Sequence, residues 1–168
     1  MRDLERIDRQ FEQIGELVAA GDPALAVHAP KISAWSVGQQ VDHMLNVAQG
    51  VFSRLTGEGE EVAERINLSG RILLGLGWFP RGVARSPKAA LPAEAPAAAA
   101  LGERLARLRG DYQDLRFRTG LLASRKRLLR HPYFGGLDCA QSLRFVAVHT
   151  HHHLKIVRDI RRAAGTRG

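Results

Sequence analysis

The residues of this sequence with the clearest capacity for chemistry are four histidines that fall within five positions. They form the run His149-Thr150-His151-His152-His153, which lies inside a long apolar repeat and is therefore not a purification tag. His149 and His153 occupy positions where a helical bundle would place Leu or Ile. The other members of this repeat, at alternating three- and four-residue spacing, are Val146, Ile156 and Ile160. Residues four apart share one face of a helix, with Cβ atoms about 6 Å apart, so this pair can bind one metal ion.

The same two histidines have a second interpretation, as hydrogen-bonded residues of the core. Replacing a core leucine with histidine forgoes about 2 kcal/mol of apolar burial at each position. The ring nitrogens also need polar partners, which either a metal ion or protein groups would supply. The sequence leaves both interpretations open. His151 and His152 project in other directions around the helix, and we expect them to lie in solvent or at its flank.

A metal site built on this pair needs at least one more protein ligand. The candidates are His28, His43 and His131. His28 follows the first predicted helix, and His131 lies in a loop before the last one. His43 lies seven residues after a predicted helix cap, beside the apolar seam of that helix. Periodicity therefore does not decide whether His43 faces the inside of a bundle or solvent.

Four long helices are predicted from apolar residues at three- and four-residue spacing. They span about residues 2–20, 36–57, 97 to the low 120s, and 138–164, and a shorter helix is expected over residues 60–74. Ser36 with Gln39, and Asp138 with Gln141, have the spacing of capping boxes that begin a helix. No segment is predicted as a strand. The expected fold class is all-α, a four-helix bundle with a long irregular crossover.

Two segments are predicted to be irregular. Residues 75–96 contain Phe79-Pro80-Arg81-Gly82, which cannot continue a helix. A connection of this length suggests a functional lid or a mobile crossover. The second irregular stretch, residues 131–136, precedes the last helix. Residues 1–168 are predicted to form a single domain of the helical-bundle type.

Composition narrows the class of protein. There are 25 Lys and Arg residues against 17 Asp and Glu, a formal net charge of +8. The single cysteine, Cys139, excludes an intrachain disulfide and favours a reducing, cytoplasmic location. The sequence has no apolar run long enough for a transmembrane helix, and its first ten residues are charged, unlike a signal peptide. We therefore expect a cytoplasmic protein without a membrane partner.

In the order and spacing of these features the sequence resembles the DinB/YfiT-like superfamily. The second helix of that family opens with Trp-Ser or Trp-Thr and carries a metal-binding histidine eight residues after the tryptophan. Here Trp35-Ser36 is followed by His43. The last helix of the family carries His-x-x-His-His or His-x-x-x-His, here residues 149–153. Two further segments resemble one branch of the superfamily, namely His131-Pro132-Tyr133-Phe134-Gly135 and Pro80-Arg81-Gly82.

The resemblance implies a four-helix bundle that holds one divalent metal ion through His43, His149 and His153. Imidazole ligands suit Zn²⁺, Ni²⁺, Fe²⁺ and Mn²⁺, so the identity of the ion is left open. One departure from the family is visible after the last histidine. Many members have Arg-Gly-Gln there, or a Gln two or three residues on, whereas this chain has Leu154-Lys155-Ile156. Any role that this Gln has in the family is therefore in doubt for this chain, whereas the set of three histidine ligands is unaffected.

Three protein nitrogens would leave a coordination position open, which is typical of catalytic sites. Relatives in the superfamily include thiol-dependent transferases and isomerases. The resemblance therefore implies a metal-dependent enzyme of hydrolase or thiol-transferase type, acting on a small molecule that is anionic or contains a thiol. Arg81, Arg85 and Lys88 would attract an anion to the mouth of such a site, or they are solvated loop charges.

Catalytic residues are not identified by this pattern. Asp42 projects about 100° away from His43 on the helix and is a poor candidate for a general base. Asn46 lies on the same side of the helix as His43. It is either a substrate contact or an ordinary polar residue at the flank of the bundle. Trp35 and Trp78 are expected to be core anchors rather than ligand platforms.

Two other classes of protein compete with this interpretation. The first is a metal-free helical scaffold, or an interaction protein that dimerises through an apolar helix face. The second is a nucleic-acid-binding protein, which the sequence pI of about 10.7 favours. No recognisable helix-turn-helix or zinc finger accompanies the basic residues, so nucleic acid is the weaker alternative.

Overall fold

The computed structural model describes residues 2–57, 60–83 and 85–165 of the chain. Within these residues four helices are long: α1 (Arg2–Ala19), α3 (Val37–Thr56), α5 (Ala98–Phe117) and α7 (Cys139–Ala163). The short elements are α2 (Asp22–Leu25), α4 (Leu68–Leu76), the 3₁₀ helix η1 (Lys88–Ala90), α6 (Thr119–Ala123), β1 (Arg127–His131) and β2 (Gly135–Asp138). The expected all-α class is confirmed, with the two small strands as an addition.

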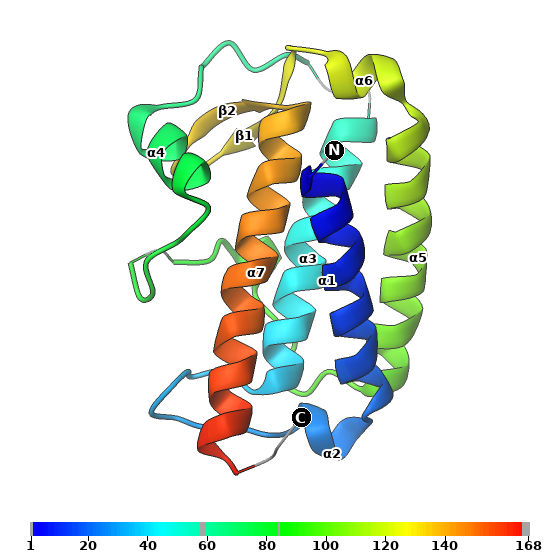
Figure 1. Ribbon diagram of the computed structural model, residues 1–168, viewed down its shortest axis with the longest axis vertical. Coiled ribbons are helices and arrows are strands. Elements are labelled where there is room, and N and C mark those ends of the chain that lie inside the picture. The colour runs from blue at the N-terminus through cyan, green and yellow to red at the C-terminus, as the bar shows by residue number, and fades with distance from the viewer. Residues whose placement is uncertain (1, 58–59, 84, 166–168) are drawn as a thin grey trace.

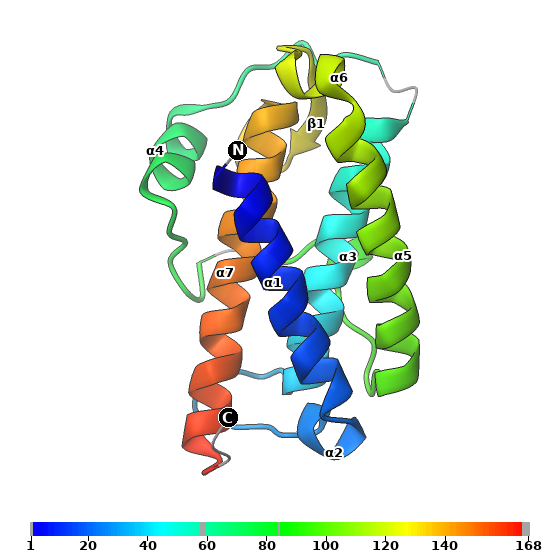
Figure 2. The same cartoon turned by 45° about the vertical axis from the view of Figure 1, so that its right-hand side comes forward.

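The four long helices pack side by side as a bundle. Helix α1 contacts α5 and α7, and α3 contacts the same two helices (Figure 1). Helices α1 and α7 run in one direction along the bundle, and α3 and α5 run in the other (Figures 1 and 2). Because α3 and α5 are parallel, the chain between them must return along the whole bundle. This crossover carries α4 on the outside of α7 and η1 against α3.

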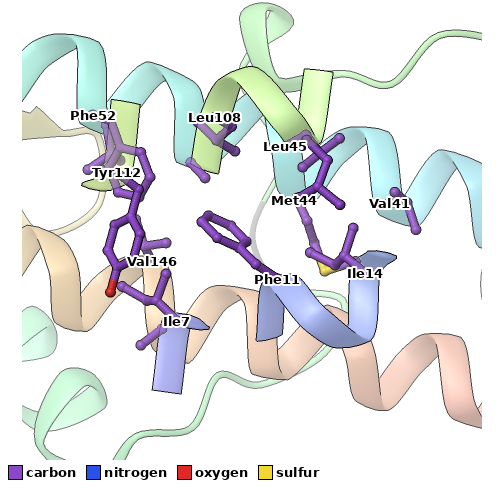
Figure 3. Close-up of a cluster of buried hydrophobic side chains, with 14 of the residues drawn as sticks. Ile7, Phe11, Ile14, Val41, Met44, Leu45, Phe52, Leu108, Tyr112 and Val146 are labelled. Carbon is purple, nitrogen blue, oxygen red and sulfur yellow. The ribbon is translucent and has the colours of Figure 1, made fainter. Parts of the chain in front are cut away.

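The core lies along the axis of the bundle, where the apolar faces of the four helices meet. Phe11, Phe52 and Tyr112 form its aromatic centre, with ring centroids 5.6–6.4 Å apart. Around them lie aliphatic side chains from all four helices, including Ile7, Ile14, Val41, Met44, Leu45, Leu108 and Val146 (Figure 3). Opposite faces of these helices are polar, and no helix among the described residues could cross a bilayer.

Both predicted capping boxes are present and fix where two long helices begin. The Ser36 hydroxyl accepts a hydrogen bond from the Gln39 amide, and the Gln39 side chain accepts one from the Ser36 amide. Asp138 and Gln141 repeat this exchange at the start of α7. These reciprocal bonds satisfy amides that have no partner within the helix. The register of α3 and α7, and hence the direction in which their histidines point, follows from these starts.

The prediction of no strands is wrong for residues 127–138. These residues form an antiparallel hairpin in which His131 pairs with Gly135. The hairpin is held by a distant segment of the chain, because the Val62 amide donates to the Arg127 carbonyl and the Asn67 amide donates to the Phe134 carbonyl. A pattern confined to neighbouring residues cannot report such contacts.

Two helix boundaries also differ from the prediction. The helix expected from residue 60 begins only at Leu68, because the backbone before it is engaged with the hairpin and Asn67 then caps α4. The third long helix ends at Phe117 instead of the low 120s. Arg118 leaves the helical region, with ψ of 69°, and the chain restarts as α6.

Gly136 should be intolerant of a side chain because its backbone lies against the chain before α4. A Cβ there would overlap the carbonyl oxygen of Glu64 and crowd Val62. We expect Gly136→Ala to destabilise the protein by about 2 kcal/mol, since backbone would have to move. The control is Gly110→Ala in α5, where nothing lies within 4 Å and alanine should stabilise by about 1 kcal/mol. Urea unfolding of both variants checks the opposite signs, and equal effects would contradict the prediction.

Candidate metal centre

Helices α3 and α7 bring three histidines together between them. One potential ligand atom each from His43, His149 and His153 lies within 4.8 Å of the other two. The Nε2 atoms of His43 and His149 are 3.1 Å apart. The ring centroids of the three imidazoles are separated by 4.4–4.9 Å. Of the three candidates for a third ligand, the structure therefore places His43 with the pair on α7.

The orientation of His43 is set by the crossover. Its Nδ1 lies 2.6 Å from the carbonyl oxygen of Ala90, the last residue of η1. Because a carbonyl can only accept, Nδ1 must carry the proton and donate it. The neutral ring then presents a lone pair at Nε2, directed at His149. A backbone carbonyl bonded to the distal nitrogen is a usual way to orient a metal-binding histidine.

His153 is oriented in the same manner by a side chain of α3. Its Nδ1 lies 2.6 Å from Gln40 Oε1, and the amide nitrogen of Gln40 donates to the Ser33 hydroxyl at 2.9 Å. The Ser33 hydroxyl also accepts from the Trp35 amide. With the Gln40 amide turned this way, His153 donates through Nδ1 and keeps a lone pair at Nε2. Gln40 is fully buried, so its amide has few other ways to be satisfied.

His149 is the member of the cluster without a hydrogen-bonded orienting group. Its Nδ1 is buried and has no partner among the described residues. Its Nε2 faces the lone pair of His43 at 3.1 Å, close to the roughly 3.4 Å that separates two nitrogens bound to one tetrahedral zinc at 2.0–2.1 Å. The donor set, three neutral imidazoles with two tautomers fixed, suits a divalent ion of the zinc or first-row transition type.

All three imidazoles favour the neutral form. Burial is the main cause that lowers the pKa of His43, although the bond to Ala90 opposes it. For His149 and His153 burial lowers the pKa well below its ordinary value, and the neighbouring histidines lower it further. A cluster of this kind resists protonation at neutral pH because adding a charge is costly in an apolar, crowded place. The ring nitrogens are therefore available as ligands.

A segment of the crossover, residues 90–93, covers the His43 end of the cluster, and we call it the strap. Besides the bond from His43 to Ala90, the Asn46 amide donates to the Leu91 carbonyl at 3.1 Å. The Ala93 amide donates to the Asp42 carboxylate at 2.7 Å. The strap is therefore tied to one face of α3 through side chains on successive turns.

Arg104 of α5 reinforces this attachment. Its guanidinium pairs with the Asp42 carboxylate and donates to the Asn46 side chain at 2.6 Å. Asp42 is almost fully buried, so its charge requires such a partner. Both residues near His43 that were considered for chemistry thus have structural roles. Asp42 is not a free general base, and Asn46 holds the strap.

The other histidines are not members of this cluster, although the His152 ring lies 5.1 Å from that of His153. His28 is exposed and bonds the Ser33 carbonyl through Nε2. His131 ends β1 and stacks on Phe134, and burial lowers its pKa to about 4. His151 is exposed, and His152 is partly buried beside Phe79, as expected for solvent and flank positions.

The predicted basic residues do not line the histidine cluster. Arg81 borders a separate cavity of about 400 Å³ on the outer side of α7, together with His151, His152 and Lys155. Arg85 and Lys88 are exposed on the crossover. Trp35 lies against His43, with ring centroids 4.9 Å apart. The expectation that Trp78 is a core anchor is wrong, because its side chain is about half exposed.

Two partners of the cluster escaped the sequence analysis. Gln40 is one helical turn before His43, a spacing that could have indicated a shared role. The carbonyl of Ala90 carries no sequence signal at all, because any residue type supplies it.

The fold and the cluster define an α-helical protein with three convergent histidines between two of its long helices. Comparison with family models finds a match to the DinB superfamily over residues 4–157. The chain belongs to the DinB superfamily, and the resemblance noted in the sequence is confirmed at that level. The comparisons with curated proteins and with solved structures found no match.

Asp42→Ala should loosen the strap. The substitution removes the acceptor for the Ala93 amide and leaves Arg104 without its ion pair. We expect a loss of about 2 kcal/mol in the free energy of unfolding and faster hydrogen exchange in residues 90–93. Glu103→Ala, which breaks the exposed ion pair with Arg107, should cost less than about 0.5 kcal/mol and leave exchange unchanged. Equal protection of the strap in both variants would contradict this role for Asp42.

Proposed function

We propose that His43, His149 and His153 bind one divalent metal ion, and that the protein is a metal-dependent enzyme. The observation that carries the proposal is the approach of two Nε2 atoms to 3.1 Å while the Nδ1 proton of His43 is committed to Ala90. Without an ion, a proton on His149 Nε2 must fill the gap between them, which leaves a bare, buried acceptor at Nδ1. With an ion, both Nε2 lone pairs have a partner, while His149 Nδ1 then carries the proton and is a buried atom without a partner in either state.

The chemistry would be of hydrolase or thiol-transferase type on a small molecule. Bound at three protein nitrogens with a position left open, a divalent ion would act as a Lewis acid and lower the pKa of a coordinated water or thiol. The protein's own part is to hold the three imidazoles neutral and oriented. Gln40 and Ala90 do this from opposite sides, and the strap and Trp35 limit the access of bulk water to His43.

A thiol substrate is favoured over water by the surroundings of His43. A hydrolytic water needs a base to take its proton, and the nearby Asp42 carboxylate is already ion-paired and hydrogen-bonded. A thiol, with an ordinary pKa near 8.5, needs much less help to lose its proton. We therefore place thiol transfer first and hydrolysis second.

Other parts of the sequence-based interpretation stay predictions. These are the single domain over residues 1–168, the cytoplasmic location, the thiol-containing or anionic nature of the substrate, and a homodimer. The alternative to an enzyme is a metal-free scaffold in which His149 donates a hydrogen bond to His43. Metal content separates the two.

Untagged protein should contain about one divalent ion per chain, the stoichiometry of a single three-histidine site. Elemental analysis after purification is the measurement, covering Zn, Ni, Fe and Mn. His43→Ala and His149→Ala should each reduce the metal content strongly, because two imidazoles alone hold an ion weakly. His151→Ala is the matched control on the same helix, since that side chain is exposed, and it should retain the metal.

The scaffold interpretation makes the opposite prediction for the same samples. Wild-type protein that takes up no metal under any loading condition, yet keeps its thermal stability after chelation, would refute the enzymatic proposal.

Gln40→Leu should weaken metal binding about 10- to 100-fold, which is the usual effect of removing a group that orients a ligand histidine. The leucine fills the same space but cannot accept the Nδ1 proton of His153. Gln40→Glu keeps an acceptor and should retain most of the affinity. Competition with a chromophoric chelator measures both variants. Wild-type affinity in Gln40→Leu would show that this hydrogen bond does not orient His153.

A further inference from the structure

Helix α4 and the turn that follows it expose an unusual set of apolar side chains. We call this set the α4 surface: Leu68, Ile72, Leu76, Trp78 and Val83, each between 50% and 75% exposed. The first three recur every four residues and therefore line one face of α4. Figure 1 shows α4 and the chain after it standing outside the bundle, beside α7.

The exposure is not a sign that α4 is loosely attached. Its inner face is buried through Gly70 and Leu74, and Gly70 packs closely on Ile66 and Phe134. The Asn67 side chain caps the helix and also donates to the Tyr133 carbonyl. Helix α4 is thus fixed by one face, and its other face has no partner within the described residues.

Exposed apolar side chains are concentrated here. Of the nine large hydrophobic residues exposed in the described chain, five belong to the α4 surface. A sixth, Tyr133, lies beside it, because its hydroxyl hydrogen-bonds the backbone of Arg85. The remaining three, Ile32, Leu91 and Phe117, come from separate segments. Clustering of this kind marks an interaction surface, whereas isolated exposed residues are ordinary.

The charge of the same segment has one sign. Residues 65–88 contain no Asp or Glu, and their charged residues are Arg65, Arg71, Arg81, Arg85 and Lys88. Arg81 is paired with Asp159 of α7 at 2.6 Å. Arg71, Arg85 and Lys88 are exposed and take part in no ion pair found among the described residues. The apolar side chains of the α4 surface therefore belong to a segment whose exposed, unpaired charges are all basic.

We propose that the α4 surface docks the protein on an anionic phospholipid bilayer. Apolar side chains on one face of a short helix, a tryptophan beside it and flanking arginines are the composition of segments that lie in a membrane interface. Basic residues near such a surface add to the affinity by attraction to anionic lipids. The sequence-based expectation of no membrane partner rested on the lack of a spanning helix, which does not bear on peripheral docking.

The charge and the apolar character of this surface argue against two other binding partners, a second copy of the chain and a nucleic acid. A second copy docked through the same surface would bring two basic segments together, and like charges repel. A nucleic acid would satisfy the arginines but would leave Leu68, Ile72 and Leu76 facing a phosphate backbone. An anionic bilayer satisfies both the charge and the apolar side chains.

The test is flotation of the protein, residues 1–168, with phospholipid vesicles. We expect binding to phosphatidylcholine vesicles that contain phosphatidylglycerol, little binding to phosphatidylcholine alone, and loss of binding at high salt. Tryptophan emission should shift to shorter wavelength on binding, because Trp78 leaves water. Trp78→Phe should abolish this shift, since the remaining tryptophan, Trp35, is partly buried and lies against His43 rather than on the α4 surface.

Paired variants separate the two contributions. Arg71→Gln with Arg85→Gln should weaken binding about 25-fold, taking about fivefold for each charge near the membrane. Ile72→Ser with Leu76→Ser should weaken it at least about tenfold through lost apolar burial. Matched controls on α5 are Arg107→Gln and Phe117→Ser, both at exposed positions, and these should bind as wild type. His43→Ala should also bind normally, so that the result is independent of the metal centre.

Several results would overturn the proposal. They are no flotation with anionic vesicles at low salt, equal binding to neutral vesicles, or equal binding by the α4 and α5 variants. A dimer in sedimentation that Leu76→Ser dissociates, without vesicle binding, would assign the surface to a second copy. Binding to duplex DNA that depends on Arg71 and Arg85 without vesicle binding would assign it to nucleic acid. Circular dichroism melts confirm that each variant is folded.

Discussion

An imidazole placed in the apolar seam of a bundle has two nitrogens, and each must find a partner. This requirement organises much of the structure around α3 and α7. His43 uses Nδ1 on the carbonyl of Ala90, and His153 uses Nδ1 on the side chain of Gln40. Both choices leave Nε2 free as a potential ligand, and that of His43 lies 3.1 Å from His149 Nε2. The buried amide of Gln40, the loop at Ser33 and the strap are all positioned so that these bonds can form. One potential ligand atom from each of the three rings then lies within 4.8 Å of the other two, and a divalent cation is the partner that would satisfy them together.

The direction of the helices explains why the crossover can supply one of those partners. Since α3 and α5 run in parallel, the chain between them must travel back along the bundle (Figure 2). A connection of this kind has to cross the outside of the helices. In this protein two parts of the connection form separate structural features. Its first part forms α4, whose apolar outer face lies in solvent. Its second part forms η1 and the strap, which closes over His43. The same topological constraint therefore yields an exposed apolar surface and a covered cluster of three histidines.

The strap depends on a polar face of α3 that a simple bundle would not need. Asp42 is almost fully buried and pairs with Arg104, and together with Asn46 they bond the backbone of residues 90–93. Burying an ion pair rarely adds net stability, because desolvation offsets most of the attraction. What it does supply is a defined position for the strap, whose residues 91–93 have no regular secondary structure. His43 benefits directly, because the orientation of its ring depends on where Ala90 lies.

The sequence by itself determined the long helices and the pair on α7. Apolar spacing and the capping boxes at Ser36 and Asp138 depend only on residues within a few turns, so they can be recognised locally. That His149 and His153 lie on one face of the helix follows from their four-residue spacing in the same way. Periodicity left His28, His43 and His131 as candidates, and the family resemblance alone singled out His43. Only the tertiary structure decided the hairpin at residues 127–138, the late start of α4 at Leu68, and the role of the Ala90 carbonyl. Each of these depends on hydrogen bonds between segments tens of residues apart, and a backbone carbonyl that receives such a bond leaves no trace in the pattern of side chains.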